Sequence, residues 1–156
     1  MTDFSPGPIV LWLASRYENL ELAEAVLVHV CRQRGIEGEN EHWIGVALRE
    51  ALANAIKHGN RGNPEKRVFL SIGGDGDELR IVVGDEGEGF EPDVLADPLA
   101  PENQLKTSGR GIFYMKTFMD DIAFSRGEAG GTVLTMRKNL NAESNAKGVK
   151  SARRPP

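Results

Sequence analysis

A second cysteine, a long apolar run and an excess of basic charge are all missing from this sequence. The only cysteine, Cys31, cannot form an internal disulfide, and its apolar helical surroundings suit a small core residue. No apolar run approaches the roughly 20 residues that a membrane-spanning helix needs. Residues 1–6 have neither the basic start nor the apolar stretch of a signal peptide. These features predict a cytoplasmic protein with no membrane partner.

The charge balance is slightly acidic. The 156 residues include 19 Lys and Arg against 23 Asp and Glu, which gives a net charge of −4. A general nucleic-acid binder usually carries a basic face, so we expect no direct nucleic-acid partner. With 40% hydrophobic residues, the chain is long enough for one domain with one core. This composition fits a protein partner or a small ligand.

Several common motifs are missing too. The P-loop pattern G-x-x-x-x-G-K-[ST] does not occur, and neither do the signatures of the eukaryotic-type kinases. Gly87 and Gly89 do not begin a dinucleotide fingerprint, because Pro92 stands where a third glycine is needed. No Ser/His/Asp arrangement stands out, and the three histidines lack the spacing of metal ligands.

Hydrophobic periodicity predicts the element order β-α-α-β-β-loop-α-β-β. The predicted strands are residues 9–14, 68–72, 79–83, 122–125 and 132–137, and the predicted helices are residues 21–34, 41–58 and 112–119. Residues 91–108 contain three prolines and no sustained period, which is typical of a functional or disordered loop. The order predicts an α+β two-layer sandwich, with a mixed, mostly antiparallel sheet and helices on one face.

We assign residues 1–140 to one domain and residues 141–156 to a polar tail. The tail contains four basic residues, Lys147, Lys150, Arg153 and Arg154. Its composition is typical of a disordered segment. The alternative is a basic arm that docks on a partner.

A polar stripe lies on the predicted helix 41–58. Glu50 and Asn54 are four residues apart and therefore share one helix face, and Lys57 follows three residues later. The amide oxygen of Asn54 suits Mg²⁺ at nucleotide phosphates, and the ammonium of Lys57 suits the phosphates themselves. Glu50 can take a proton from a hydroxyl or a water. The alternative is a solvated helix face with a Glu50–Asn54 pairing.

A first glycine segment, Asp85-Glu-Gly87-Glu-Gly89, directly follows the predicted strand 79–83. Its glycines let the backbone approach a ligand closely. Asp85, at the strand end, can accept a hydrogen bond from an exocyclic amine. The alternative is a plain turn, because Asp and Gly gather in turns for local reasons.

A second glycine segment, Gly109-Arg110-Gly111, precedes the predicted helix 112–119. Backbone N–H groups at the start of a helix form an anion site, and Arg110 and Lys106 can add charge-assisted contacts. The alternative is a flexible hinge with solvated charges.

Taken together, these segments resemble the ATP-binding domain of gyrase-type topoisomerases, Hsp90 chaperones, sensor histidine kinases and MutL proteins. The polar stripe looks like the N-box of that superfamily, the glycine segments look like its two glycine boxes, and Gly131-Thr132 looks like its closing strand motif. Within the superfamily, Glu50-Ala51-x-x-Asn54-Ala55-x-x-His58-Gly59 is similar to the bacterial anti-sigma-factor serine/threonine kinases. Lys57 departs from that subgroup and is more typical of histidine kinases.

The resemblance implies a role for each matching position. Glu50 would be the general base, and Asn54 would ligate Mg²⁺. Asp85 would bind the adenine amino group, with Thr132 assisting through a water. The phosphates would lie against Lys57 and the second glycine segment. The implied nucleotide-binding residues are Asn54, Lys57, His58, Asp85, Gly87, Gly89, Gly109, Arg110, Gly111 and Thr132.

The implied activity is ATP-dependent phosphorylation, with Mg²⁺, of an anti-anti-sigma antagonist protein, whose phosphorylation frees the kinase to bind a sigma factor. A homodimer is a further expectation from the resemblance. One alternative is a non-catalytic module in which nucleotide only sets affinity for a sigma factor or another regulator. A less favoured alternative is an ATPase piece of a larger machine. The absence of a preceding phosphoacceptor-histidine region argues against a complete sensor histidine kinase.

Overall fold

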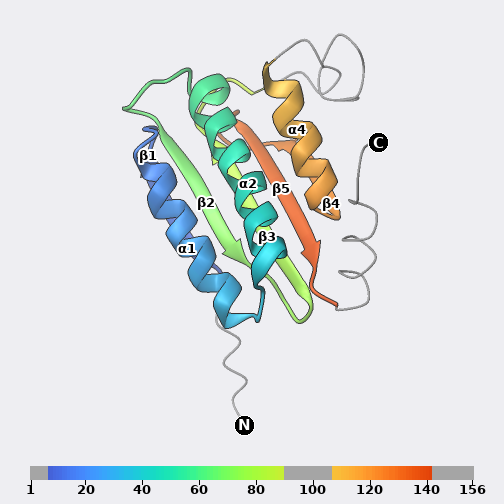
Figure 1. Ribbon diagram of the computed structural model, residues 1–156. Helices are drawn as coiled ribbons and strands as arrows, with labels where there is room; N and C mark the ends of the chain where they lie inside the picture. Colours follow the sequence, from blue (N-terminus) through green and yellow to red (C-terminus); the bar gives the residue numbers. More distant parts are fainter. Residues whose placement is uncertain (1–6, 90–106, 142–156) are drawn as a thin grey trace.

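One open sheet of five strands carries the described helices on one of its faces (Figure 1). The computed structural model describes residues 7–89 and 107–141. The strands are β1 (Ile9–Ala14), β2 (Arg67–Gly73), β3 (Glu78–Asp85), β4 (Asp121–Arg126) and β5 (Thr132–Asn139). The helices are α1 (Asn19–Gln33), α2 (Gly38–Asn54), the π-helical turn η1 (Ala55–Gly59) and α4 (Thr107–Phe118).

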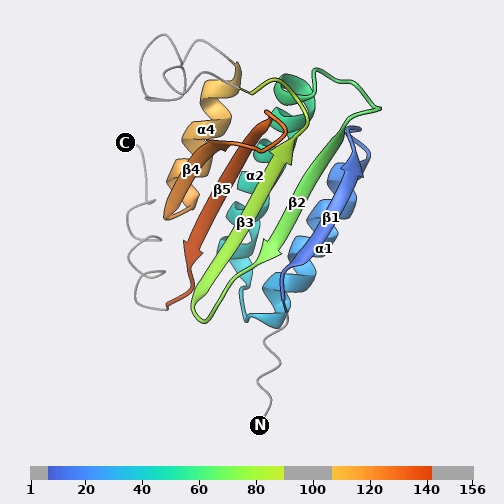
Figure 2. The same cartoon turned by 180° about the vertical axis from the view of Figure 1, so that it is seen from behind.

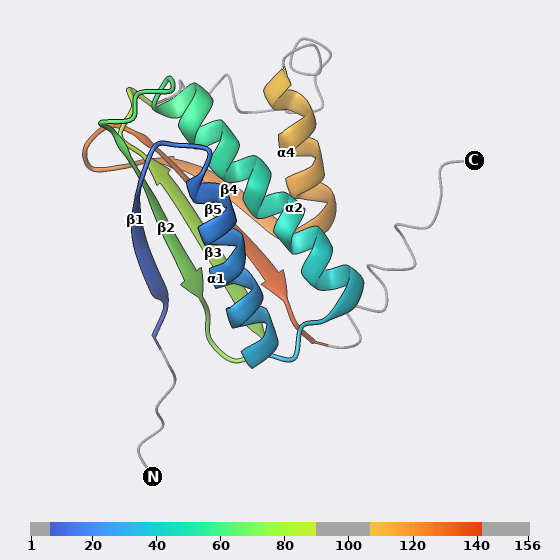
Figure 3. The same ribbon diagram turned by 60° about the vertical axis from the view of Figure 1, so that its left-hand side comes forward.

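The sheet has the strand order β1-β2-β3-β5-β4, and each neighbouring pair is antiparallel. Figure 2 shows the sheet in front of the helices, and Figure 3 shows α1, α2 and α4 on the same side of it. The predicted α+β two-layer sandwich is therefore confirmed. The sheet was predicted to be mixed and mostly antiparallel, and all the pairings of the described strands are antiparallel.

Strict alternation along the central strands builds the core. Leu70 of β2, Ile81 of β3 and Met136 of β5 are fully buried against the helices. Their neighbours in sequence, such as Arg80 and Arg137, point to the other face and are exposed. Side chains of a strand point alternately to the two faces, so one layer of helices buries every second residue.

The long predicted helix 41–58 becomes two elements. The apolar stripe of α2 is buried as expected, with Ala47 and Leu48 fully inaccessible. After Asn54, however, the chain widens into the π-helical turn η1, which ends where the N–H of Asn60 donates to the Ala55 carbonyl at 2.8 Å. Apolar periodicity does not report this change, because Ala55 and Ile56 are buried, as the apolar stripe of a continued α-helix would also predict.

The start of α4 differs from its prediction. The helix begins at Thr107, so the segment Gly109-Arg110-Gly111 lies inside the helix and does not precede it. Glycine lowers intrinsic helix propensity, which is why the sequence suggested a later start. Gly111 is nevertheless buried against α2, where a side chain would overlap a neighbour. The close packing of α4 on α2 thus outweighs the low helix propensity of its glycines.

The predicted loop at 91–108, except for Thr107 and Ser108, lies outside the described residues, as does nearly all of the predicted tail. Lys106 lies outside them as well, and the side chain of Arg110 is not described. Among residues 7–89 and 107–141, none of the helices combines the length and apolar character that crossing a membrane requires.

Truncation of the core leucine on α2 should destabilise the fold strongly. Leu48 is fully buried, whereas Leu22 on α1 is 51% exposed. We expect Leu48→Ala to lower the free energy of unfolding by about 2–5 kcal/mol, through lost burial and the cavity left behind. Leu22→Ala, the matched helical control, should change it little. Urea denaturation of both variants measures the difference, and equal effects would contradict the packing described here.

Candidate functional site

Five elements meet at one end of the sheet. They are the end of α2 with η1, the start of β2, the end of β3, the first turn of α4 and the start of β5 (Figures 1 and 2). The antiparallel order explains the convergence, because β3 ends where its neighbours β2 and β5 begin. The polar stripe and the glycine segments, which are distant in sequence, are thereby brought to one edge.

The carboxylate of Asp85 is enclosed by backbone. Its Oδ1 accepts hydrogen bonds from the N–H groups of Gly87, at 2.9 Å, and Thr132, at 3.2 Å. A Cβ at Gly59 would overlap the carboxyl group, and a Cβ at Gly131 would overlap the Asp85 carbonyl oxygen. The segments around Gly59, Asp85 and Gly131 can approach one another this closely only because glycines stand at the contacts.

Burial raises the pKa of the Asp85 carboxyl group above its ordinary range. The hydrogen bonds from Gly87 and Thr132 and the charge of Lys66 act in the opposite direction and limit the rise. Both backbone donors bind the same oxygen, Oδ1. A carboxylate can accept about four hydrogen bonds, so the group has capacity left for a ligand donor.

The hydroxyl of Thr132 supports a polar ligand or water at this place. Thr132 is buried, and its Oγ1 has no hydrogen-bond partner among the described residues. An unsatisfied buried hydroxyl typically costs about 1–3 kcal/mol, so such groups usually face a water or ligand. Because its backbone N–H binds Asp85, Thr132 is fixed beside the carboxylate.

The other end of the site joins α2 to α4. A methyl group at Gly111 would lie 2.8 Å from Oε2 of Glu50 and 3.4 Å from Nδ2 of Asn54. The second glycine segment therefore packs directly on the polar stripe. A carboxylate, an amide and the backbone of α4 at Gly111, one turn from the start of that helix, stand together here, a set that suits phosphate and Mg²⁺ chemistry.

Lys57 and His58 lie in η1. The side chain of Lys57 is exposed, and that of His58 is half-buried. Burial, and secondarily the charge of Lys57, lowers the pKa of His58. The expectation that Lys57 shares the face of Asn54 assumed α-helical winding, and the π-helical turn changes the angle between them. π-helical turns are frequent at functional sites.

The first glycine segment is tied down at its far end. Arg126 of β4 donates from Nη2 to the Glu88 carbonyl at 3.0 Å and from Nε to the Gly130 carbonyl at 3.3 Å. Gly89 has a φ of +79°, and a Cβ there would lie 2.5 Å from the Gly130 oxygen. Gly87 and Gly89 thus make close contacts with the backbone of Gly59 and Gly130, and their contact with a ligand stays a prediction.

Sequence reasoning missed Asn60, which lies between the predicted helix 41–58 and the predicted strand 68–72. Asn60 is fully buried, and its side chain accepts a hydrogen bond from the backbone of Glu86 at 2.8 Å, directly after Asp85. The only signal was an asparagine immediately after the helix-ending Gly59, which also suits an ordinary turn.

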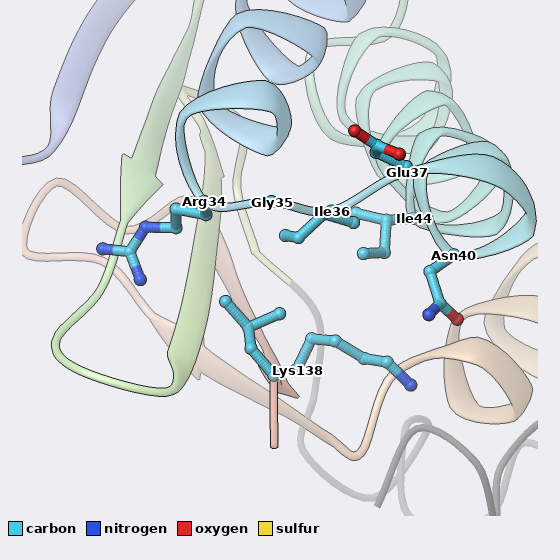
Figure 4. A pocket seen from close by; sticks show the side chains of 8 residues that line it. Arg34, Gly35, Ile36, Glu37, Asn40, Ile44 and Lys138 are labelled. Atoms are coloured by element: carbon cyan, nitrogen blue, oxygen red, sulfur yellow. The ribbon is translucent and has the colours of Figure 1, made fainter. Parts of the chain in front are cut away.

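A separate cavity lies at the opposite end of the fold, between the end of α1, the start of α2 and the end of β5 (Figure 4). Arg34, Asn40 and Lys138 are among its lining residues. Arg34 donates to the carbonyls of Gly74 and Glu78 and so holds the β2–β3 turn. This cavity shares no residue with the cluster around Asp85 and Glu50.

Residues 13–138 match the histidine kinase-like ATPase domain. The chain belongs to this family. It is 36% identical to the anti-sigma F factor of Bacillus cytotoxicus over 105 residues, which cover 66% of this chain and 71% of that protein. It is 27% identical to the serine-protein kinase RsbW of Bacillus subtilis over 132 residues, 81% of each chain. The resemblance to the superfamily and to its anti-sigma-factor kinases is therefore confirmed.

Two solved structures share the fold. The RsbU and RsbW domains of a Mycobacterium tuberculosis protein align with a TM-score of 0.61 and 19% identity, over 85% of this chain and 32% of that one. The catalytic domain of histidine kinase ThkA aligns with a TM-score of 0.58 and 13% identity, over 85% and 95%. The family is a family of ATPase domains, which implies that the protein binds a nucleotide.

The adenine role expected of Asp85 predicts that Asp85→Asn weakens ATP binding, because an amide cannot accept as strongly as a carboxylate and its NH₂ would face the adenine amine. Loss of a charge-assisted hydrogen bond predicts a roughly 10- to 100-fold rise in the Kd for ATP. Asp75→Asn, an exposed turn residue at the other end of β3, removes the same charge and is the control. Calorimetric titration of both variants measures the change, and an unchanged Kd for Asp85→Asn would exclude the adenine role.

Proposed function

We propose that the protein is an ATP-dependent serine/threonine kinase and anti-sigma factor, which phosphorylates an anti-anti-sigma antagonist in partner switching. The observation that carries the kinase activity is the position of Glu50. Its carboxylate lies against Gly111, beside Asn54, at the end of the site that is lined by helix ends. The relatives named anti-sigma F factor and serine-protein kinase RsbW support the anti-sigma part.

The adenine would lie at the end of β3. Its amino group would donate to the Asp85 carboxylate, and the Thr132 hydroxyl would assist through a water. The unsatisfied Oγ1 of Thr132 and the remaining acceptor capacity of Asp85 support this placement. Gly87 and Gly89, whose missing side chains leave room for the Gly59 and Gly130 carbonyls, would present their backbone to the base and sugar.

The phosphates would lie between η1 and the start of α4. Lys57 and His58 from η1 would hold them, together with the Arg110 side chain. The backbone N–H groups of Gly109 and Arg110, in the first turn of α4, would add to these contacts, and Gly111 would leave room for close approach. The single side-chain oxygen of Asn54 fits Mg²⁺, which prefers oxygen ligands and keeps several waters. When bound, Mg²⁺ would neutralise charge on the phosphate oxygens.

Glu50 would act as the general base. It would take the proton from a serine or threonine hydroxyl of the antagonist while that oxygen attacks the γ-phosphorus and ADP leaves. Such transfer relies on positioning and charge stabilisation more than on covalent chemistry by the protein. A phosphorylated antagonist would no longer compete for the kinase, which would then bind its sigma factor, and the acting species would be a homodimer.

Glu50→Gln should separate binding from transfer. The amide keeps the shape of the side chain but cannot accept the proton, so we expect ATP binding to persist and phosphoryl transfer to fall roughly 10²–10⁴-fold. The assay follows labelled phosphate from ATP to candidate antagonist proteins. Glu39→Gln, an exposed residue in the first turn of α2, is the control on the same helix.

Two outcomes would count against the kinase. Unchanged transfer by Glu50→Gln would mean that Glu50 is not the base. If the parent protein binds ATP and yet transfers phosphate to no antagonist, the non-catalytic module is the better description. In that case, retention of a sigma factor by Glu50→Gln should equal that of the parent.

A further inference from the structure

Asn60 is a fully buried amide beside the proposed adenine end of the site. It directly follows η1, where the end of a surface helix would ordinarily expose a polar residue. Burying an amide without hydrogen bonds is costly, so its partners explain why an asparagine can stand there.

Each polar atom of the Asn60 side chain has a partner. Nδ2 donates to the Ser15 hydroxyl at 3.2 Å and to the Arg67 carbonyl at 2.9 Å. Oδ1 accepts from the N–H of Glu86 at 2.8 Å. The two donated bonds anchor the side chain to the end of β1 and the start of β2, and the accepted bond holds the chain just beyond β3.

Glu86 stands between Asp85 and Gly87, the residues that form the adenine end. Holding the Glu86 N–H therefore fixes the turn in which the Asp85 carboxylate binds the Gly87 N–H. Gly59 reinforces this contact from the other side, because a Cβ at Gly87 would overlap its carbonyl oxygen. The end of η1 and the end of β3 are thus locked together around one carboxylate.

We propose that Asn60 is a positioning residue for base recognition. It orients Asp85 through the Glu86 backbone and so sets the preference for a purine with a 6-amino group over one with a 6-oxo group. This inference depends on the proposed adenine role of Asp85. A purely structural role for Asn60 would affect folding but not that preference.

The preference is measured as the ratio of the Kd values for ATP and inosine triphosphate, which carries a 6-oxo group in place of the amine. We expect Asn60→Ala to weaken ATP binding by roughly tenfold, the size expected for one lost buried hydrogen bond, with little effect on inosine triphosphate. Asn60→Ser, which keeps a small polar group in the site, should act in the same direction and serves if the alanine variant does not fold.

Ser15→Ala is the matched control. It removes one partner of the same amide but leaves the hydrogen bond to Glu86 in place. It should therefore lower the free energy of unfolding and leave the ratio of the two Kd values unchanged. Asn60 does not position Asp85 if Asn60→Ala weakens the binding of both nucleotides equally. The same conclusion follows if Ser15→Ala changes the ratio of the two Kd values as much as Asn60→Ala does.

A double-mutant cycle separates this inference from the adenine assignment. In an Asp85→Asn background, Asn60→Ala should no longer change ATP affinity, because its effect passes through the carboxylate. If Asp85→Asn alone leaves ATP binding intact, the adenine role fails. If Asp85→Asn weakens binding and the Asn60 effect simply adds to it, only the positioning role fails.

Discussion

The packing of backbone around the Asp85 carboxylate is the constraint on which the candidate site depends. Desolvation makes a buried charge costly, and two backbone N–H groups from different segments offset part of that cost. Those donors reach Oδ1 only because Gly59 and Gly131 allow the chain to pass so near. A single carboxylate therefore determines where the end of η1, the first glycine segment and the start of β5 must lie.

The two ends of the site are built differently. Around Asp85, three β-strands and their hydrogen bonds define the geometry, and the ladder between β3 and β5 fixes Thr132 beside the carboxylate. Around Glu50, the geometry comes from the packing of two helices on Gly111. The first arrangement suits recognition of a rigid base. The second places a carboxylate and an amide on α2, a helix anchored by the core through Leu48 and Leu52.

Much of this could be read from the sequence, for reasons visible in particular residues. Leu79, Ile81 and Val83 alternate with polar or half-buried neighbours, so β3 and its buried face were evident. The polar stripe with Glu50 and Asn54 on α2 was equally clear. The start of α4 was misplaced because glycine propensity says nothing about the space that Glu50 occupies beside Gly111. Asn60 was missed because its partners, Ser15, Arg67 and Glu86, come from three distant segments.

The π-helical turn links these two kinds of contact. An α-helix continued through Gly59 would bond the Asn60 N–H to Ile56, whereas η1 bonds it to Ala55. Widening the ladder by one residue rotates everything that follows by roughly 100°, one residue's turn of an α-helix. With this winding, the Asn60 amide bonds to the start of β2 and to the chain just beyond β3, and Gly59 lies against Asp85. The π-helical end of this helix, which local propensity does not favour, thus places Gly59 and Asn60, which follow the polar stripe, next to the Asp85 segment.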